Sequence, residues 1–162
     1  MDKLRFLNKK ESERIIGMVE SQFGFKGKLD YIFALSLKNN VYIVNRDLAR
    51  IDIDRLRLNS VGLYFGEMVG HEIRMSIEGA QIIGPGSSKN VVELDFNEQL
   101  DWLKGKDIEK EKKDDSEDAF ILLKHGSDFL GCGRQRGNKI INYMPKTRRL
   151  SLKGDYFGQE SE

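Results

Sequence analysis

The sequence predicts an α+β protein with an N-terminal α/β unit followed by a C-terminal unit made mostly of strands. Three observations support this prediction: a helix signal near the N-terminus, β-prone runs in both halves, and a Gly-Pro-Gly-Ser-Ser break at residues 84–88. Glycine, proline and serine interrupt regular structure, and this break carries no hydrophobic pattern. We therefore expect a first domain over 1–87, a second over 88–155 and an acidic tail over 156–162.

A helix is predicted over residues 9–23. Asn8 and Glu11 have the spacing of a capping box, in which each side chain accepts a hydrogen bond from the backbone N–H of the other residue. Apolar residues then recur every three or four positions, and Gly24 supplies a residue that easily adopts positive φ where a helix ends. One face of this helix should therefore pack on a core.

The rest of the N-terminal half is predicted to contain two pairs of strands. The first pair is a hairpin that turns at Asn39 and Asn40, because asparagine tolerates the left-handed backbone of tight turns. The second pair is hinged at Gly70 and leads into a helical turn. The expected ranges are 31–37 and 41–44 for the first pair, 61–68 and 71–77 for the second, 46–60 for an intervening short helix or turn that leads into a strand, and 76–83 for the helical turn.

The C-terminal half is predicted to be a strand, a short helix and a three-stranded meander. Asp95 and Glu98 repeat the capping-box spacing, and the helix that follows should end at Gly105. Residues 106–118 mix both charge signs densely around one aliphatic residue, so we expect an exposed, mobile loop. The strands are expected at 91–94, 119–125, 129–135 and 139–144, with a terminal strand fragment and a frayed tail over 153–162.

Charge is distributed very unevenly along the chain. Residues 119–153 contain eight Lys or Arg and one acid, whereas residues 91–118 contain five Lys or Arg and eleven acids. The formal net charge of +1 hides this difference. Cations that alternate with short apolar runs on strands are presented on one surface, which favours a polyanion, and RNA first, as the partner.

Eight cations are the predicted RNA contacts. Four lie on the predicted meander and its turns, and three follow Pro145, where the chain leaves the sheet for the surface. A solvated surface turn is the alternative interpretation of those three. By contrast, Arg46, Arg50, Arg55 and Arg57 alternate with aspartates and are expected to form internal salt bridges. The predicted contacts are Lys124, Arg134, Arg136, Lys139, Lys146, Arg148 and Arg149, with Lys89 at the domain junction.

Glycines and aromatic residues accompany the cations on the predicted strands. Gly126, Gly131 and Gly133 have no side chains, so a phosphate or an unstacked base could approach the backbone there. The alternative is that they mark a bulge in a tight barrel. Tyr143 and Phe129 could stack on bases, or belong to the core.

The sequence contains no motif typical of a membrane protein, an exported protein, a zinc site or a nucleotide-dependent enzyme. No apolar run approaches the roughly 18 residues of a membrane span, and the charged N-terminus does not resemble a signal peptide, so a cytoplasmic protein is expected. Cys132 is the single cysteine and, with only His71 and His125, forms no zinc pattern. Neither a P-loop nor a dinucleotide fingerprint is present, so no cofactor or metal is predicted. An RNA-modifying enzyme that uses Cys132 and His125 stays open as an alternative.

The segments VVELD, FNEQLDWLKGKDI, AFILLKHGSDFLGCGR and KIINYMPKTRR resemble a PUA domain, the small pseudo-barrel shared by pseudouridine synthases and archaeosine transglycosylases, over residues 90–153. FLGCG and PKTRR also resemble the tail domain of the Nol/Nop/Sun group of RNA cytosine methyltransferases, here without a catalytic domain. Ser127 departs from that pattern, in which a second glycine is usual. Residues 41–85 resemble the pre-PUA α/β domain of the Nip-type ribosome-biogenesis factors of eukaryotes and archaea.

These resemblances imply an RNA-binding protein of archaeal type that acts in rRNA maturation or in the modification of rRNA or tRNA, and that is not itself an enzyme. Family PUA domains bind RNA along the short helix after the first strand and the neighbouring strands, which corresponds here to residues 97–105 and the following hairpin. Because Glu98 and Asp101 make that helix acidic, we favour the basic strands as the RNA surface. A protein-interaction adaptor that docks through residues 106–118 is the alternative, with ribosome-assembly or RNA-processing proteins as partners.

Overall fold

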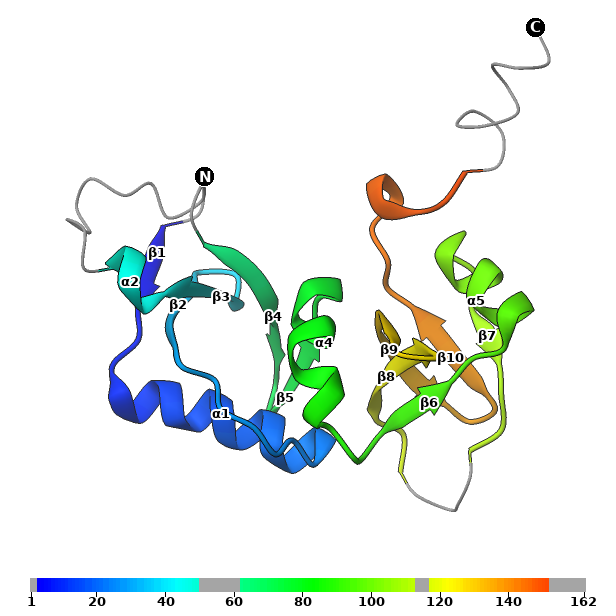
Figure 1. The fold of residues 1–162 in the computed structure, drawn as a ribbon, viewed down its shortest axis with the longest axis horizontal. Coiled ribbons are helices and arrows are strands. Elements are labelled where there is room, and N and C mark those ends of the chain that lie inside the picture. The colour runs from blue at the N-terminus through cyan, green and yellow to red at the C-terminus, as the bar shows by residue number, and fades with distance from the viewer. Residues whose placement is uncertain (1–2, 50–61, 113–116, 152–162) are drawn as a thin grey trace, which may run out of the picture.

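The computed structural model describes residues 3–49, 62–112 and 117–151, which form two five-stranded sheets (Figure 1). The first sheet has the order β1-β2-β3-β4-β5, and all its neighbouring strands are antiparallel. The predictions for residues 50–60 and 153–162 lie outside the described residues. The strands of this sheet are β1 (Leu4–Phe6), β2 (Tyr31–Ser36), β3 (Asn40–Asn45), β4 (Leu63–Val69) and β5 (Glu72–Met75), with the short helix α2 (Arg46–Ala49) after β3.

Helix α1 (Lys9–Phe23) confirms the prediction from the capping sequence. Asn8 accepts a hydrogen bond from the backbone N–H of Glu11, whose carboxylate in turn accepts one from the backbone N–H of Asn8. Gly24 ends the helix in the left-handed conformation, at φ 59°. Near this end, the Gln22 amide exchanges two hydrogen bonds with the backbone of Ile73 in the edge strand β5, which attaches the helix to the sheet.

The predicted hairpins are also confirmed. Asn39 has a φ of 65° in the turn between β2 and β3, and Gly70 has a φ of 62° between β4 and β5. Helix α4 (Ile77–Ile83) follows at the predicted helical turn, and Ser76 caps it by accepting a hydrogen bond from the backbone N–H of Gly79. The 3-10 turn η2 (Gly84–Gly86) then occupies the predicted break.

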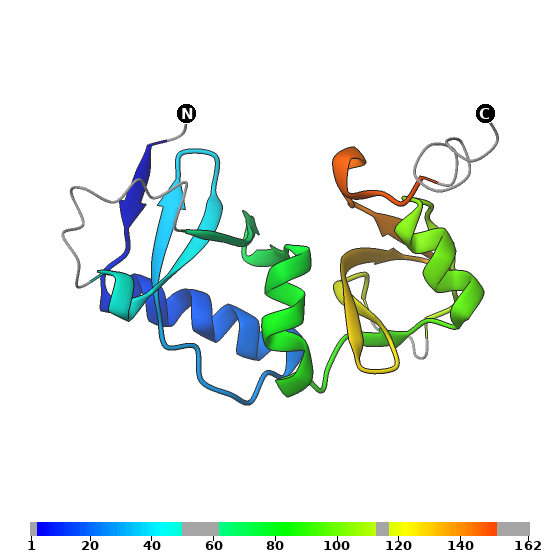
Figure 2. The same cartoon turned by 45° about the horizontal axis from the view of Figure 1, so that its top comes forward.

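The second sheet is curled and has the order β6-β8-β9-β10-β7 (Figures 1 and 2). The predicted meander is confirmed as three antiparallel strands, and β6 is added parallel to β8. Helix α5 (Phe96–Leu103) starts with the predicted capping box of Asp95 and Glu98. The elements are β6 (Val91–Glu93), β7 (Ile108–Glu109), β8 (Phe120–His125), β9 (Asp128–Arg136), β10 (Lys139–Asn142) and the 3-10 turn η3 (Lys146–Arg148).

The prediction of an exposed loop over residues 106–118 is wrong at β7. Ile108, the one aliphatic residue of that stretch, is buried and pairs with Ile140 of β10. Asp107 and Glu109 on either side are exposed, as alternation on an edge strand requires. Composition alone misses this strand because one buried side chain is enough to form a short edge strand when the neighbouring strand β10 already offers unpaired backbone groups. Residues 113–116 of the predicted loop lie outside the described residues.

Strand β8 is buried on both faces, and its alternation divides the core in two. Phe120 and Leu122 belong to a cluster that also contains Ile15, Phe33 and other residues of the first sheet and α1. Ile121 and Leu123 pack instead with Trp102 of α5 in a second cluster. Because the first cluster includes residues from both halves, the sheets share part of their core, with α4 between them (Figure 2). The proposed domain boundary at residue 87 stays a prediction.

None of the helices in the described ranges is long and apolar enough to cross a membrane.

Candidate nucleic-acid interface

The predicted cations occupy separate parts of the second sheet. Lys124 lies near the end of β8, at one end of the β8–β9 hairpin, whereas Arg136 ends β9 at the other. A strand of nine residues such as β9 spans roughly 25 Å at about 3.3 Å per residue. Lys146 begins η3 beyond β10, and Lys89 precedes β6. The eight predicted contacts therefore do not form one compact patch.

Two of the predicted contacts form ion pairs between the two halves of the chain. Nη1 of Arg134 lies 2.6 Å from Oε2 of Glu72 in β5, and its guanidinium carbon lies 4.6 Å from the centre of the Phe120 ring. Nη1 of Arg148 lies 2.7 Å from Oε1 of Glu78 in α4. Because carboxylates already hold both guanidinium groups, these arginines connect the two halves and are less free to bind phosphate.

Two further predicted contacts are held within the C-terminal half. Nζ of Lys139 lies 3.7 Å from Oδ2 of Asp107. Nε of Arg149 donates a hydrogen bond of 3.0 Å to the carbonyl oxygen of Met144, and the side chain packs beside Gly105. Arg149 therefore fastens the segment after β10 to the end of α5.

Five predicted cations have no carboxylate partner within 4 Å in the part of the chain that the structure describes, and Arg149 is one of them. Arg149 is already held by the Met144 carbonyl oxygen, which leaves four others. Lys89 and Lys124 make weaker contacts: Lys89 Nζ lies 3.3 Å from the carbonyl oxygen of Ser21, and Lys124 Nζ lies 5.9 Å from the centre of the Phe129 ring. Arg136 and Lys146 are exposed. These four cations are the best placed for phosphate contacts.

The acidic residues of α5 are paired with lysines. Glu98 lies 3.0 Å from Nζ of Lys110, and Asp101 lies 3.6 Å from Nζ of Lys106. The acidic helix that we expected to disfavour RNA is thus partly neutralised by the residues that follow it.

The three glycines predicted to admit an RNA backbone differ in their surroundings. Gly126 lies in the open β8–β9 turn, at φ 61°. Gly131 is buried, with φ 126°, and faces Ile77 of α4. Beside Gly133, a Cβ atom would lie 2.7 Å from the Trp102 ring and 2.8 Å from the carbonyl oxygen of Ile141. The absence of a side chain at Gly133 is therefore required by Trp102 packing, and no space for RNA remains there.

Cys132 and His125 are not brought together. Cys132 is buried in the first hydrophobic cluster. His125 Nδ1 lies 2.8 Å from the carbonyl oxygen of Leu94, and its ring contacts that of Phe96 on the α5 side of the sheet. Burial raises the pKa of the Cys132 thiol to about 12. At neutral pH this thiol is protonated, and His125, the base predicted for it, lies on the other side of the sheet, which is the opposite of an activated nucleophile.

We expect Cys132 to resist alkylation in the folded protein. With a pKa of about 12, the thiolate fraction at pH 8 is about 10⁻⁴, against about one quarter for an ordinary thiol of pKa about 8.5. Iodoacetamide should react roughly a thousandfold more slowly with the folded chain than in 8 M urea, as followed by mass spectrometry. Equal rates in both conditions would show that the thiol is accessible and ionised.

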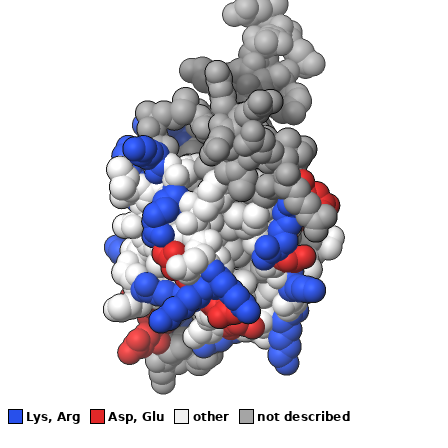
Figure 3. Space-filling view, turned by 90° about the vertical axis from the view of Figure 1, so that its left-hand side faces the viewer, with Lys and Arg blue, Asp and Glu red and all other residues white. Residues whose placement is uncertain are grey.

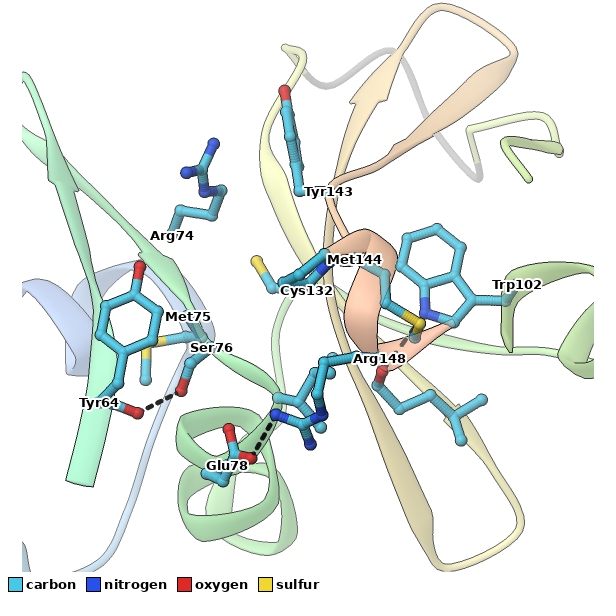
Figure 4. Close-up of a pocket in the computed structure, with 14 residues that line it drawn as sticks. Tyr64, Arg74, Met75, Ser76, Glu78, Trp102, Cys132, Tyr143, Met144 and Arg148 are labelled. Atoms are coloured by element: carbon cyan, nitrogen blue, oxygen red, sulfur yellow. Dashed lines mark hydrogen bonds and ion pairs between the residues drawn. The ribbon is translucent and has the colours of Figure 1, made fainter. Parts of the chain in front are cut away.

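A cavity of about 160 Å³ lies between the two sheets (Figure 4). Tyr64 of β4 and Arg74 of β5 lie on one side, and Tyr143 and Arg148, which follow β10, lie on the other. Much of the remaining wall is apolar. It includes Met75, Ile77, Trp102, Leu130 and Met144.

The polar groups of this cavity are held in place by their neighbours. Arg74 pairs with Glu67 and lies with its guanidinium carbon 4.6 Å from the centre of the Tyr143 ring. Burial, followed by the charge of Glu67, raises the pKa of the Tyr64 phenol, so this group is a hydrogen-bond donor at neutral pH. Ser76 Oγ donates to the carbonyl oxygen of Tyr64. The cavity thus combines flat aromatic surfaces with fixed cations.

Most of the residues that line this cavity could not be predicted from the sequence. Tyr143 is a predicted stacking residue and Arg148 a predicted phosphate contact, but Tyr64, Arg74 and Glu78 come from distant strands and a helix that carry no motif. Phe129, the other aromatic residue predicted either to stack or to join the core, is buried in the first cluster against Gly84.

The N-terminal half carries cations as well. Arg46 lies 2.6 Å from Asp30, so it forms an ion pair, but with an aspartate outside the stretch for which salt bridges were predicted. Arg50, Arg55 and Arg57 lie outside the described residues. Figure 3, which looks onto the side of β1 and α2, shows Lys and Arg side chains spread over this face with acidic groups among them. Positive charge is therefore not confined to the C-terminal sheet.

Comparisons with known proteins show similarity to one group of rRNA methyltransferases. Residues 89–150 match the family model described as the Methyltransferase RsmF PUA domain. Ribosomal RNA small subunit methyltransferase F of Aeromonas hydrophila is 24% identical over 139 residues, which are 85% of this chain and 28% of that enzyme. The Aeromonas salmonicida enzyme is 23% identical over 151 residues, 92% of this chain and 30% of its own length. The Vibrio cholerae enzyme is 24% identical over 108 residues, 67% of this chain and 22% of its own length.

These findings narrow the expected resemblances. The relatives are bacterial, so the archaeal assignment is not supported, and the resemblance of residues 41–85 to Nip-type factors stays a prediction. The chain spans less than a third of the length of these relatives. The expected resemblance to the tail domain of RNA methyltransferases is confirmed at the level of the PUA domain: residues 89–150 are similar to the PUA domain of the RsmF methyltransferases.

Proposed function

We propose that the protein binds RNA through its C-terminal half and acts in rRNA modification. The observation that carries this proposal is the match of residues 89–150 to the PUA domain of an rRNA methyltransferase family. The match begins next to the Gly-Pro-Gly-Ser-Ser segment, which supports a separate RNA-binding unit over residues 88–155.

Four cations that neither pair with a carboxylate in the described residues nor are held like Arg149 are the proposed phosphate contacts: Lys89, Lys124, Arg136 and Lys146. They lie on different parts of the second sheet and its flanks, so together they could follow an extended RNA backbone better than a single bound phosphate. Lysine and arginine supply most phosphate contacts, which position a nucleic acid without reading its sequence.

We further propose that this chain contributes RNA binding and no catalysis of its own. The separation of Cys132 from His125 and the raised pKa of the Cys132 thiol argue against the alternative of a cysteine-dependent enzyme. The adaptor alternative loses part of its docking element, because Ile108 and Glu109 belong to the sheet. rRNA, in the cytoplasm, is the proposed target.

Neutralising three of these four cations should weaken RNA binding and reduce its dependence on salt. In the triple variant Lys124→Gln, Arg136→Gln, Lys146→Gln, we expect the slope of log K against log salt to become less negative by about 2 to 2.7, because each phosphate that is no longer neutralised removes about 0.7 to 0.9 from the slope. Fluorescence anisotropy with a labelled rRNA hairpin measures both affinity and slope.

A variant with the same change in charge on the N-terminal half is the control. Lys26, Lys28 and Lys38 are exposed, and replacing all three with Gln should leave most of the slope unchanged. If the slope of log K against log salt becomes less negative by as much in this control as in the first variant, the binding surface is not the C-terminal sheet.

A further inference from the structure

We propose that the cavity between the two sheets holds a single unstacked nucleobase of the bound RNA. This inference rests on the proposed RNA-binding function and adds to it a base pocket that the phosphate contacts do not require. Both halves of the chain build the pocket: Tyr64, Arg74 and Glu78 come from the first half, and Tyr143 and Arg148 come from the second (Figure 4).

The size and the walls of the cavity fit one small aromatic ring system. A cavity of about 150 Å³ lined by apolar side chains holds a benzene ring, and this cavity measures about 160 Å³. Its walls combine the rings of Tyr64, Tyr143 and Trp102 with methionine side chains. Aromatic side chains of this kind stack on unpaired bases in proteins that bind single-stranded RNA.

Two guanidinium groups, each fixed by a carboxylate, present flat planes at the cavity: Arg74 pairs with Glu67, and Arg148 pairs with Glu78. Arg74 is held over the Tyr143 ring, and Arg148 is held by Glu78 in the cavity wall. Arginine planes also stack on bases, so Arg74 and Tyr143 together extend the flat surface at the cavity. Flat aromatic and guanidinium surfaces suit the face of a base, which favours a nucleobase over a lipid or a hydrophobic peptide.

The backbone keeps the cavity open on the side of β9. Gly131 lines it at φ 126°, a conformation that L side chains rarely adopt, and a Cβ atom there would lie 3.4 Å from Ile77. The next residue, Cys132, places a small thiol in the same wall (Figure 4). Small residues at consecutive positions leave the room that a base would occupy.

The test compares two RNA hairpins that differ only at one nucleotide. The first carries a single bulged uridine, and the second carries an abasic ribose at the bulge, so both have the same number of phosphates. We expect the wild-type chain to bind the first hairpin about fivefold to a hundredfold more tightly, the range expected for stacking of one base on aromatic side chains. The emission of Trp102, the one tryptophan of the chain, should change with the first hairpin only.

Variants at the cavity separate base binding from general RNA binding. Tyr143→Leu should lose the preference for the bulged uridine and still bind the abasic hairpin as the wild type does, whereas Tyr143→Phe should keep the preference. Phe96→Leu is the matched control, because Phe96 is an exposed aromatic residue of α5 that does not line the cavity. It should behave like the wild type.

The outcomes distinguish this proposal from the one on which it rests. Equal, salt-dependent binding of both hairpins by the wild type would overturn the base pocket and leave RNA binding intact. Absence of binding to either hairpin at 50 mM salt would overturn both proposals. A preference that Tyr143→Leu retains would show that the base is read elsewhere on the protein.

Discussion

Replacing Trp102 with Ala should destabilise the protein by about 3–5 kcal/mol, the range for removing a large buried aromatic side chain. Trp102 is 1% exposed and is among the largest fully buried side chains of the described residues. Its Nε1 donates a hydrogen bond of 3.3 Å to the carbonyl oxygen of Leu130, and its ring covers Gly133. The substitution would therefore leave a cavity and also remove this hydrogen bond. Urea unfolding followed by circular dichroism measures the loss.

The matched control is Phe96→Ala, on the same helix. Phe96 is 62% exposed, so its removal should change the free energy of unfolding by no more than about 0.5 kcal/mol. A domain with an ordinary stability of about 5–15 kcal/mol loses a large fraction of it in the first variant and little in the second. If both variants unfold at the same urea concentration, α5 does not contribute to the core as the structure indicates.

RNA affinity should fall about 50- to 150-fold between 50 and 200 mM monovalent salt. This range follows from four phosphate contacts, which give a slope of log K against log salt of about −2.8 to −3.6. Lys89, Lys124, Arg136 and Lys146 supply these contacts. Each of them releases condensed counter-ions from the RNA, and added salt makes that release less favourable. Fluorescence anisotropy titrations at four or more salt concentrations measure the slope.

An uncharged osmolyte separates this effect from a general effect of solutes. The same titration with sucrose at matched osmolality should leave the affinity nearly unchanged. An affinity that does not respond to salt would contradict the proposed phosphate contacts. A slope about one and a half times as steep, near −4.2 to −5.4, would indicate that Arg134 and Arg148 also exchange their carboxylate partners for phosphates when RNA binds. The variants Glu72→Gln and Glu78→Gln, which remove those carboxylates, test this possibility.

Local signals in the sequence are sufficient for most helices and turns. The capping boxes at Asn8 and Asp95, and the turns at Asn39 and Gly70, depend only on residues within a few positions of one another. Alternation along β8 also places its two faces correctly, because successive side chains of a strand point to opposite sides. Local signals do not predict strand β7, because its pairing depends on β10, about 30 residues further along the chain.

Less of the candidate site than of the fold can be predicted from the sequence. Composition identifies the cations of the C-terminal half, but it does not say which of them are already paired. Glu72 and Glu78 hold Arg134 and Arg148 from about 60 and 70 positions away, and no local pattern connects these residues. In the same way, the sequence predicts Gly133 as a place for a ligand, whereas Trp102 fills the space beside it.

The sequence by itself determined the capped helices, the tight turns, the alternation of the strands and the excess of positive charge in the C-terminal half. These properties depend on neighbouring residues and on composition. Among the described residues, the tertiary structure alone decided which cations pair with carboxylates, and that two tyrosines and two arginines from both halves surround one cavity. The reason is that contacts between distant segments depend on how the two sheets pack, which no short stretch of the chain specifies.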